Sequence, residues 1–174
     1  MAKPCNAATY RAATLKLAQS VNPKVVVEVG VYAGALSAML ASLPTLERLF
    51  VIDSWKGDYC KMGQPHMDEI AKGVIEWGAT DPKVDVRRLD SKVAAQAFDD
   101  ESIDFWHTDG DHSLAGITGD ISSWIGKVKP GGIFAASVPT PFSEHAFHFG
   151  TDEYFNSPGG HVRIFTVPRL MAML

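Results

Sequence analysis

The stretch VVVEVGVYAG at residues 25–34 decides the fold of this chain. Three β-branched residues open it and favour a buried strand, and the glycines near its end favour a turn. The segment 35–43 follows with apolar residues at helical spacing. An apolar strand, a glycine turn and a helix in this order are typical of the first unit of a nucleotide-binding α/β domain. The pattern predicts a ligand over the turn, where the start of the helix leaves N–H groups unpaired.

Glu28 distinguishes between two classes of ligand for this turn. In the dinucleotide-binding pattern G-x-G-x-x-G/A, Gly30 and Ala33 fit, but Glu28 takes the place of the first glycine. A carboxylate there would repel a pyrophosphate and would attract a ligand that carries an ammonium group. Gly30 can adopt a positive φ and leaves no side chain in the way of a ligand. The residues therefore favour a ligand without phosphates, and an ordinary strand–helix turn is the alternative.

Length and composition are those of one soluble globular domain. The chain has 174 residues, 46% hydrophobic and 21% charged, enough for a sizeable core. The net charge of −4, without a Lys/Arg cluster in the sequence, weighs against nucleic acid as the main partner. Cys5 and Cys60 lack metal-ligand spacing and are expected to be free thiols. With no signal peptide and no apolar segment of about 18 residues, we expect a cytoplasmic protein without a membrane partner.

Hydrophobic periodicity and breaker residues divide the chain into alternating strands and helices. Residues 6–21 predict a leading helix that packs on the sheet edge or on a partner subunit. The expected strands are 25–29, 49–52, 84–89, 103–108, 133–138 and 161–167, and the later helices are 34–43, 65–77, 92–98 and 114–127. Residues 129–132 predict a turn and 139–160 an irregular segment. This alternation predicts an α/β fold: a single domain over 1–174, with a doubly wound, mostly parallel sheet and helices on both faces.

Acidic side chains stand at the carboxyl ends of four successive predicted strands: Glu28, Asp53, Asp90 and Asp109. Because a ligand lies beyond these ends in an open parallel sheet, the four carboxylates are expected to face it together. Helix capping is the alternative role, since Asp favours the N-cap position. Asp53 lies at the right distance after the glycine turn to accept from both hydroxyls of a ribose, and Asp90-Ser91 is placed to accept from an adenine amino group. Trp55 or Leu89 would cover the face of that ring, unless these side chains belong to the core.

Four motifs carry a resemblance to a known family: E-x-G-x-x-x-G at 28–34, I-D-x-W-x-G-D at 52–58, H-x-D-G-D-H-S at 107–113 and K-P-G-G at 129–132. Together they resemble the class I S-adenosylmethionine-dependent methyltransferases, in particular the small group with macrocin-type sugar O-methyltransferases and cephalosporin-hydroxylase-like proteins. The resemblance covers about residues 24–136. It implies a Rossmann-like fold, S-adenosylmethionine as cofactor, and methyl transfer to an oxygen atom of a small-molecule acceptor.

The same resemblance implies roles for single residues. Glu28 and Gly30 would line the methionine end of the cofactor, and Asp53 its ribose. Asp90-Ser91 would meet the adenine, and Asp109 would lie nearest the transferring methyl group. The whole expected cofactor-binding set is Glu28, Gly30, Tyr32, Gly34, Asp53, Ser54, Trp55, Asp90, Ser91 and Asp109. Segment 139–160 would shape the acceptor side of the pocket.

A hydroxyl acceptor needs a general base in addition to a near-attack geometry. His112, in the loop after the strand 103–108, is the first candidate for that base. Asp109 or Asp111 would orient His112 or act in its place. The alternative role for His112 is a hydrogen bond within the turn that starts the next helix.

Asp109 and Asp111 also suggest a hard cation such as Mg²⁺, because two carboxylates two residues apart can turn toward one ion. The sugar-methyltransferase relatives complete such a site with an acidic or His-Asp pair just after the fifth strand. Here residues 137–139 read Ser-Val-Pro, which contains no ligand of that kind. Either no metal is used, or the ligands come from the irregular segment: Glu144, His145 or His148.

Two other function classes compete with methyl transfer. A nicotinamide-dependent oxidoreductase is disfavoured by Glu28. A non-catalytic relative that keeps the fold, and with it the cofactor, is favoured by the altered end of the fifth strand and by room for one final strand instead of the usual hairpin. Relatives with a leading helix often pair through it, so a homodimer is a further expectation.

Overall fold

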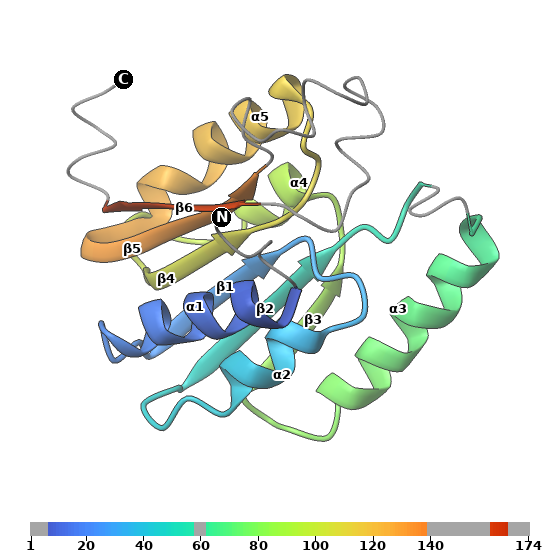
Figure 1. Ribbon diagram of the computed structural model, residues 1–174, viewed down its shortest axis with the longest axis horizontal. Coiled ribbons are helices and arrows are strands. Elements are labelled where there is room, and N and C mark those ends of the chain that lie inside the picture. Colours follow the sequence, from blue (N-terminus) through green and yellow to red (C-terminus); the bar gives the residue numbers. More distant parts are fainter. Residues whose placement is uncertain (1–6, 58–61, 139–160, 167–174) are drawn as a thin grey trace, which may run out of the picture.

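The computed structural model describes residues 7–57, 62–138 and 161–166. In these parts of the chain six strands form one sheet in the order β3-β2-β1-β4-β5-β6 (Figure 1). The strands are β1 (Val25–Val29), β2 (Arg48–Asp53), β3 (Val84–Arg88), β4 (Ile103–Thr108), β5 (Val128–Val138) and β6 (His161–Thr166). The helices are α1 (Ala7–Gln19), α2 (Ala35–Ala41), α3 (Gln64–Gly78), α4 (Ser91–Ala95) and α5 (Leu114–Trp124), and a 3-10 turn, Ile125–Lys127, follows α5.

The strand order places a ligand-binding crevice at the centre of the sheet. Strands β1 to β5 are parallel, and β6 runs antiparallel to β5. The chain moves outward from β1 through β2 to β3, and then returns past β1 to form β4. The order therefore reverses between β1 and β4, the point at which open α/β sheets bind their ligands. The predicted doubly wound, mostly parallel α/β fold is confirmed.

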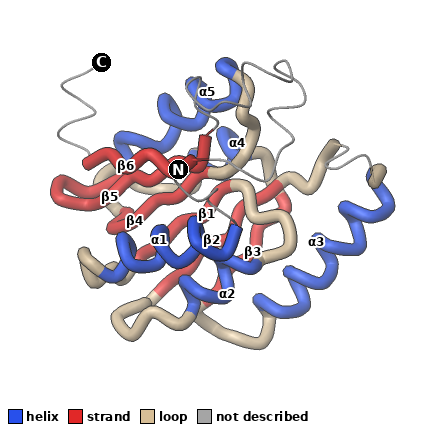
Figure 2. Tube along the Cα trace, in the orientation of Figure 1, coloured by secondary structure: helices blue, strands red, loops and turns tan. Residues whose placement is uncertain are grey.

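Helices cover both faces of the sheet, with α1, α2 and α3 on one side and α4 and α5 on the other (Figure 1, Figure 2). Successive residues of a strand point to opposite faces. Val26 accordingly packs in the hydrophobic cluster under α1–α3, whereas Val27 and Val29 pack in the cluster under α4 and α5. Burial on both faces explains why β1 is almost entirely apolar, and Glu28 shares the α1–α3 face with Val26.

The turn predicted at residues 129–132 is wrong, because these residues belong to β5. Ile103 of β4 pairs with Val128, and the next paired residue of β4, Phe105, pairs with Ile133. Residues 129–132 therefore form a bulge between the two pairs, and Gly131 supplies a positive φ of 83° in it. Proline and glycine residues signal a bulge and a turn equally well, so the sequence could not separate the two.

The leading helix α1 packs over the face of the sheet rather than at its edge. Its Ala18 is fully buried in the cluster under α1–α3, together with Phe105 of β4 and Ala135 of β5. Segment 139–160 and residues 58–61 lie outside the described residues. None of the helices in the described part of the chain has the length and apolar character that crossing a bilayer requires.

Candidate active site

The turn after β1 is held by a carboxylate from the end of β2. Asp53 Oδ2 accepts hydrogen bonds from the backbone N–H groups of Val31 at 2.8 Å and Tyr32 at 3.0 Å. Its Oδ1 accepts from the N–H of Trp55 at 2.7 Å. Phosphates at such turns bind to the same kind of free N–H group. The protein's own anion therefore occupies the donors that a diphosphate would need.

Gly30 allows the turn after β1 to meet the loop after β4. Its φ is 79°, and a Cβ at this position would lie 2.3 Å from the carbonyl carbon and oxygen of Asp109. The sequence predicts a ligand in this space, but backbone atoms of Asp109 fill it. Gly34, with φ of 73°, is the N-cap of α2, which lacks a side-chain cap.

Trp55 belongs to the hydrophobic core, one of the two roles that the sequence left open beside covering an adenine ring. Its side chain is fully buried, and its indole N–H donates to the carbonyl of Tyr32 at 2.8 Å. Leu89, the other candidate for covering an adenine ring, remains 42% exposed at the end of β3. Tyr32 and Trp55 both have positive φ, 51° and 45°. Backbone strain of this kind in non-glycine residues is concentrated at functional sites.

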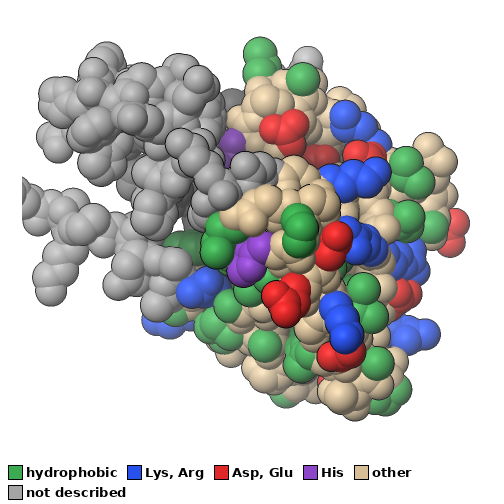
Figure 3. All heavy atoms as spheres, turned by 90° about the vertical axis from the view of Figure 1, so that its right-hand side faces the viewer, with side chains coloured by type: hydrophobic (Ala, Val, Ile, Leu, Met, Phe, Trp, Pro, Cys, Tyr) green, Lys and Arg blue, Asp and Glu red, His purple; other side chains and the backbone are tan. Residues whose placement is uncertain are grey.

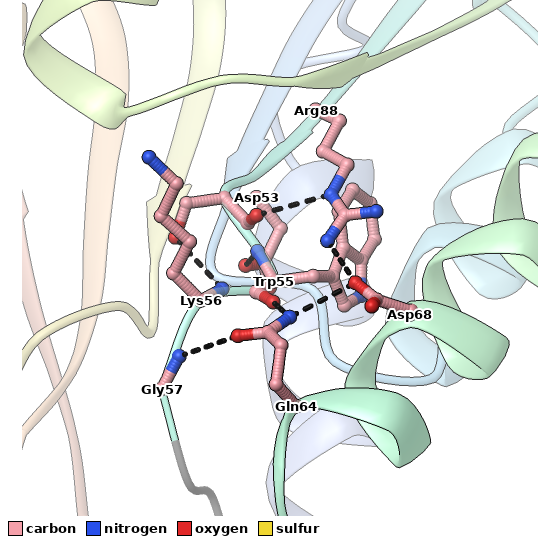
Figure 4. A network of polar contacts seen from close by, with 8 residues as sticks. Asp53, Trp55, Lys56, Gly57, Gln64, Asp68 and Arg88 are labelled. Carbon is pink, nitrogen blue, oxygen red and sulfur yellow. Dashed lines mark hydrogen bonds and ion pairs between the residues drawn. The ribbon is translucent and has the colours of Figure 1, made fainter.

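A second polar network fixes the segment after β2 against α3 (Figure 4). Gln64 Nε2 donates to the carbonyl of Trp55 at 2.7 Å and to Asp68 Oδ1 at 2.9 Å. Arg88 at the end of β3 forms an ion pair with the same Asp68. Ser54 Oγ accepts from the N–H of Lys56 at 3.3 Å. The network therefore holds the backbone on which Asp53, Ser54 and Trp55 stand.

Asp90 and Ser91 both have structural partners. Asp90 is the N-cap of α4, and its Oδ1 accepts from the N–H groups of Lys92 at 3.0 Å and Val93 at 3.3 Å. Ser91 Oγ accepts from the indole N–H of Trp124 at 2.9 Å. The capping role that the sequence offered as an alternative is therefore present at Asp90. Adenine binding by this pair stays a prediction.

Asp109 follows β4 and is held by two donors. Tyr10 of α1 donates its hydroxyl to Oδ2 at 2.9 Å, and His112 Nε2 lies 3.0 Å from Oδ1. Burial alone would raise the pKa of Asp109, but the hydrogen bond from His112, the nearby histidines and the hydroxyl of Tyr10 lower it below its usual value. Asp109 is thus an anion in the neutral pH range.

The contact with Asp109 determines which nitrogen of His112 can act as a base. An ionised carboxylate only accepts hydrogen bonds, so Nε2 of His112 must carry the proton that this bond requires. In the neutral ring the lone pair then lies on Nδ1. The expected contact between His112 and an aspartate is present, and the aspartate is Asp109. The role of His112 as a general base stays a prediction.

Asp111 is not part of that pair. Its Oδ1 accepts from the N–H of Ser113 at 2.9 Å, and its Oδ2 accepts from the Ser113 hydroxyl at 3.0 Å. Ser113 in turn caps α5 by accepting from the N–H of Gly116 at 3.0 Å. Asp111 therefore stabilises the start of α5. These bonds give Asp111 a structural partner, and its catalytic role as orienter or base stays a prediction.

The two aspartates also do not fit a magnesium site. The oxygens of Asp109 bond to Tyr10 and His112, while those of Asp111 bond to Ser113. Within residues 7–57, 62–138 and 161–166, no three His, Cys, Asp or Glu side chains are grouped as metal ligands. The other candidate ligands lie outside the described residues: Glu144, His145 and His148.

Glu28 and His107 lie side by side beneath the site, paired in register between β1 and β4. Glu28 is 2% exposed, and the Ser37 hydroxyl donates to its Oε2 at 2.5 Å. Burial raises the pKa of Glu28 to about 8 and lowers the pKa of His107 to about 4. Glu28 is therefore mainly protonated at neutral pH in the free protein. The sequence alone predicts a charged carboxylate at this position.

His107 and Tyr10 are the residues of this site to which the sequence assigned no role. Both ring nitrogens of His107 are buried without a hydrogen-bond partner among the described residues. The rings of Tyr10 and His107 are stacked, with centroids 6.0 Å apart. His107 is the first residue of the H-x-D-G-D-H-S motif, so the sequence marked this residue without indicating its role. Tyr10 lies in a helix without any motif, and only the fold brings it to Asp109.

Comparisons with known proteins agree with this geometry. A family model described as a methyltransferase domain matches residues 27–136. No curated protein matches the chain. Similar solved structures include a spermidine synthase from Thermotoga maritima, with a TM-score of 0.60, 15% identity, and coverage of 89% of this chain and 49% of that one. Another is a spermidine synthase in complex with the transition-state analogue AdoDATO, with a TM-score of 0.61, 17% identity, and coverage of 89% and 51%.

The N-methyltransferase NodS from Bradyrhizobium japonicum WM9 is similar with a TM-score of 0.56, 17% identity, and coverage of 83% of this chain and 75% of that one. The chain spans about half the length of the spermidine synthases. At these identities the likeness to solved structures is one of fold. The family match covers more than half of the chain, from β1 to the end of the parallel sheet, and the chain therefore belongs to the methyltransferase-domain family.

Proposed function

We propose that the chain is an S-adenosylmethionine-dependent methyltransferase. The observation that carries the proposal is the Asp53 carboxylate on the N–H groups of Val31 and Tyr32. A diphosphate cofactor would have to displace it, whereas an adenosine ligand with a cationic sulfur and no phosphate would not. Membership of the methyltransferase-domain family implies the same cofactor.

The residues at the strand ends fit the parts of this cofactor. Asp53 keeps acceptor capacity for one ribose hydroxyl, because a carboxylate offers about four lone-pair sites and the N–H groups of Val31, Tyr32 and Trp55 use three. Glu28 and Gly30 border the position of the methionine end, and Asp90 and Ser91 that of the adenine. When bound, S-adenosylmethionine supplies a methyl group on a positively charged sulfur. The protein then needs to orient the acceptor and exclude water.

We propose an oxygen atom of a small molecule as the methyl acceptor. His112 Nδ1 takes the proton of the acceptor hydroxyl, and Asp109 stabilises the imidazolium that forms. This arrangement supports the macrocin-type group of O-methyltransferases, which shares the D-G-D-H-S element at 109–113. Acidic and basic side chains form ion pairs such as Arg88–Asp68 and Lys72–Glu76. On the face shown in Figure 3, basic and acidic side chains are interspersed. Such a face suits a small molecule better than nucleic acid.

Methyl transfer from labelled S-adenosylmethionine to a panel of hydroxyl and amine acceptors tests the activity. We expect an acceptor with a hydroxyl to be methylated, and His112→Ala to lower kcat by about 10²-fold or more while leaving cofactor affinity nearly unchanged. His66→Ala, in α3, is the matched control and should retain the wild-type rate, because the side chains that bond to the Asp109 carboxylate are those of Tyr10 and His112. A normal rate in His112→Ala would remove His112 as the base. Cofactor binding without turnover on any acceptor would favour a non-catalytic relative.

A further inference from the structure

The carboxylate of Asp109 is fixed from two directions by residues far apart in the chain. His112 meets Oδ1 from the loop after β4, and Tyr10 meets Oδ2 from α1, 99 residues earlier. A side-chain carboxylate with one donor can rotate about its Cβ–Cγ bond, since this torsion is broad. Donors on both oxygens fix its plane. The direction from Oδ1 to His112 Nε2 therefore depends on the Tyr10 hydroxyl.

The Tyr10 ring is held in place independently of its hydroxyl. It stacks on the His107 ring, with an interplanar angle of 29°. His107 is fully buried in β4, two residues before Asp109 in the chain. Removing the Tyr10 hydroxyl should therefore leave the ring where it is.

Tyr10 cannot itself act as the base. Burial, followed by the negative charge of Asp109, raises the pKa of Tyr10 far above its usual value. The phenol thus remains a hydrogen-bond donor wherever the protein is folded. Its influence on the chemistry passes through Asp109 to His112.

We propose that Tyr10 is a positioning residue of the active site, whose hydroxyl orients Asp109 so that Asp109 holds His112 in the tautomer with its proton on Nε2. The leading helix α1 is then part of the catalytic apparatus, although it precedes the residues that match the family model. The inference rests on the proposed role of His112 as base. Its structural half, the link from Tyr10 to the His112 tautomer, can be tested without any methyl acceptor.

The test compares Tyr10→Phe with Thr14→Val in the full chain. Both variants remove one hydroxyl from α1, but Thr14 contacts only backbone in this way. The ¹⁵N chemical shifts of the His112 ring, recorded at alkaline pH without ligand, report its tautomer. We expect a single Nε2–H tautomer in the wild type and in Thr14→Val, and a mixture in Tyr10→Phe. Once a methyl acceptor is known, Tyr10→Phe should lower kcat by about tenfold and leave the affinity for S-adenosylhomocysteine unchanged.

Asp109→Asn leaves α1 intact and supplies a second variant should Tyr10→Phe fail to fold. It should lose the single tautomer, because an amide can donate as well as accept. In the Asp109→Asn background, Tyr10→Phe should have no further effect on kcat. The inference is overturned if Tyr10→Phe or Asp109→Asn keeps the wild-type tautomer, or if Thr14→Val loses it to the same extent as Tyr10→Phe. A protein that methylates nothing yet shows these tautomer changes would refute the proposed function alone.

Discussion

Glu28 and His107 place two neutral groups beneath the site. Burial raises the pKa of Glu28 to about 8 and lowers that of His107 to about 4. A cationic ligand end near Glu28 would favour its ionised form. Cofactor binding should therefore be accompanied by proton release from Glu28, and attraction to an ammonium group develops on binding rather than before it.

The protonated state of Glu28 makes stability fall with rising pH. Above pH 6.5, the ordinary pKa of His107, that histidine is mainly neutral in both the folded and the unfolded state. The unfolded chain has lost the Glu28 proton above pH 4.5, whereas the folded chain keeps it up to about pH 8. The free energy of unfolding should thus drop by roughly 1 kcal/mol between pH 6.5 and 8, since the proton that unfolded His107 still loses just above pH 6.5 offsets part of the Glu28 effect.

Glu28→Gln should abolish this drop, because the amide does not titrate. Urea denaturation at both ends of the pH range measures it, and Glu69→Gln, at an exposed position of α3, is the control that should retain the wild-type slope. An unchanged slope in Glu28→Gln would mean that Glu28 is ionised in the folded protein.

At the scale of elements, the site is made where two strand-end loops touch. The Asp109 N–H donates to the Val29 carbonyl at 2.8 Å, and the Gly30 N–H donates to the Ile52 carbonyl at 2.9 Å. These bonds continue the sheet pairing past the ends of β1, β2 and β4. The absence of a side chain at Gly30 lets Asp109 approach closely enough to make this contact.

A comparison of Gly30→Ala with Gly131→Ala distinguishes the stability cost of crowding Asp109 from the cost of a positive φ alone. Their φ values are 79° and 83°, but an added Cβ meets Asp109 backbone at 2.3 Å in the first case and nothing within 4 Å in the second. Gly131→Ala should cost about 1–2 kcal/mol of stability from the left-handed conformation alone. Gly30→Ala should cost several kcal/mol more by chemical denaturation, since backbone must move. Equal losses would show that the contact with Asp109 is not tight.

The elements of the sheet were predictable where burial left a simple pattern. The bounds of β1 and β4 match the prediction because both strands are buried along nearly their whole length. The bulge at residues 129–132 was missed because Pro and Gly mark turns as well. Sequence spacing also could not tell Asp109 from Asp111, since one loop carries both and only their hydrogen bonds differ. The role of Tyr10 could not be predicted, because no local sequence pattern indicates a contact between residues 99 positions apart.

At the scale of the whole molecule, the reversal of strand order between β1 and β4 gathers residues from most of the described chain. Asp53 comes from the β2 end, Asp109 and His112 from the loop after β4, and Tyr10 from the leading helix. The acids at the ends of β1 to β4 belong to neighbouring parallel strands, and their joint contact with one ligand stays a prediction. This edge can take an adenosine ligand without phosphates, and that is the central claim of the functional proposal.

Calorimetric titration with S-adenosylhomocysteine and with NAD tests this claim most directly. We expect the wild type to bind S-adenosylhomocysteine and not NAD. Asp53→Ala should weaken that binding by on the order of a few kcal/mol, because a charged acceptor and the support of the turn are lost. Asp81→Asn, which alters an aspartate whose side chain accepts from the Lys83 N–H in the turn before β3, should bind like the wild type. Binding of NAD without S-adenosylhomocysteine, or unchanged affinity in Asp53→Ala, would contradict the account.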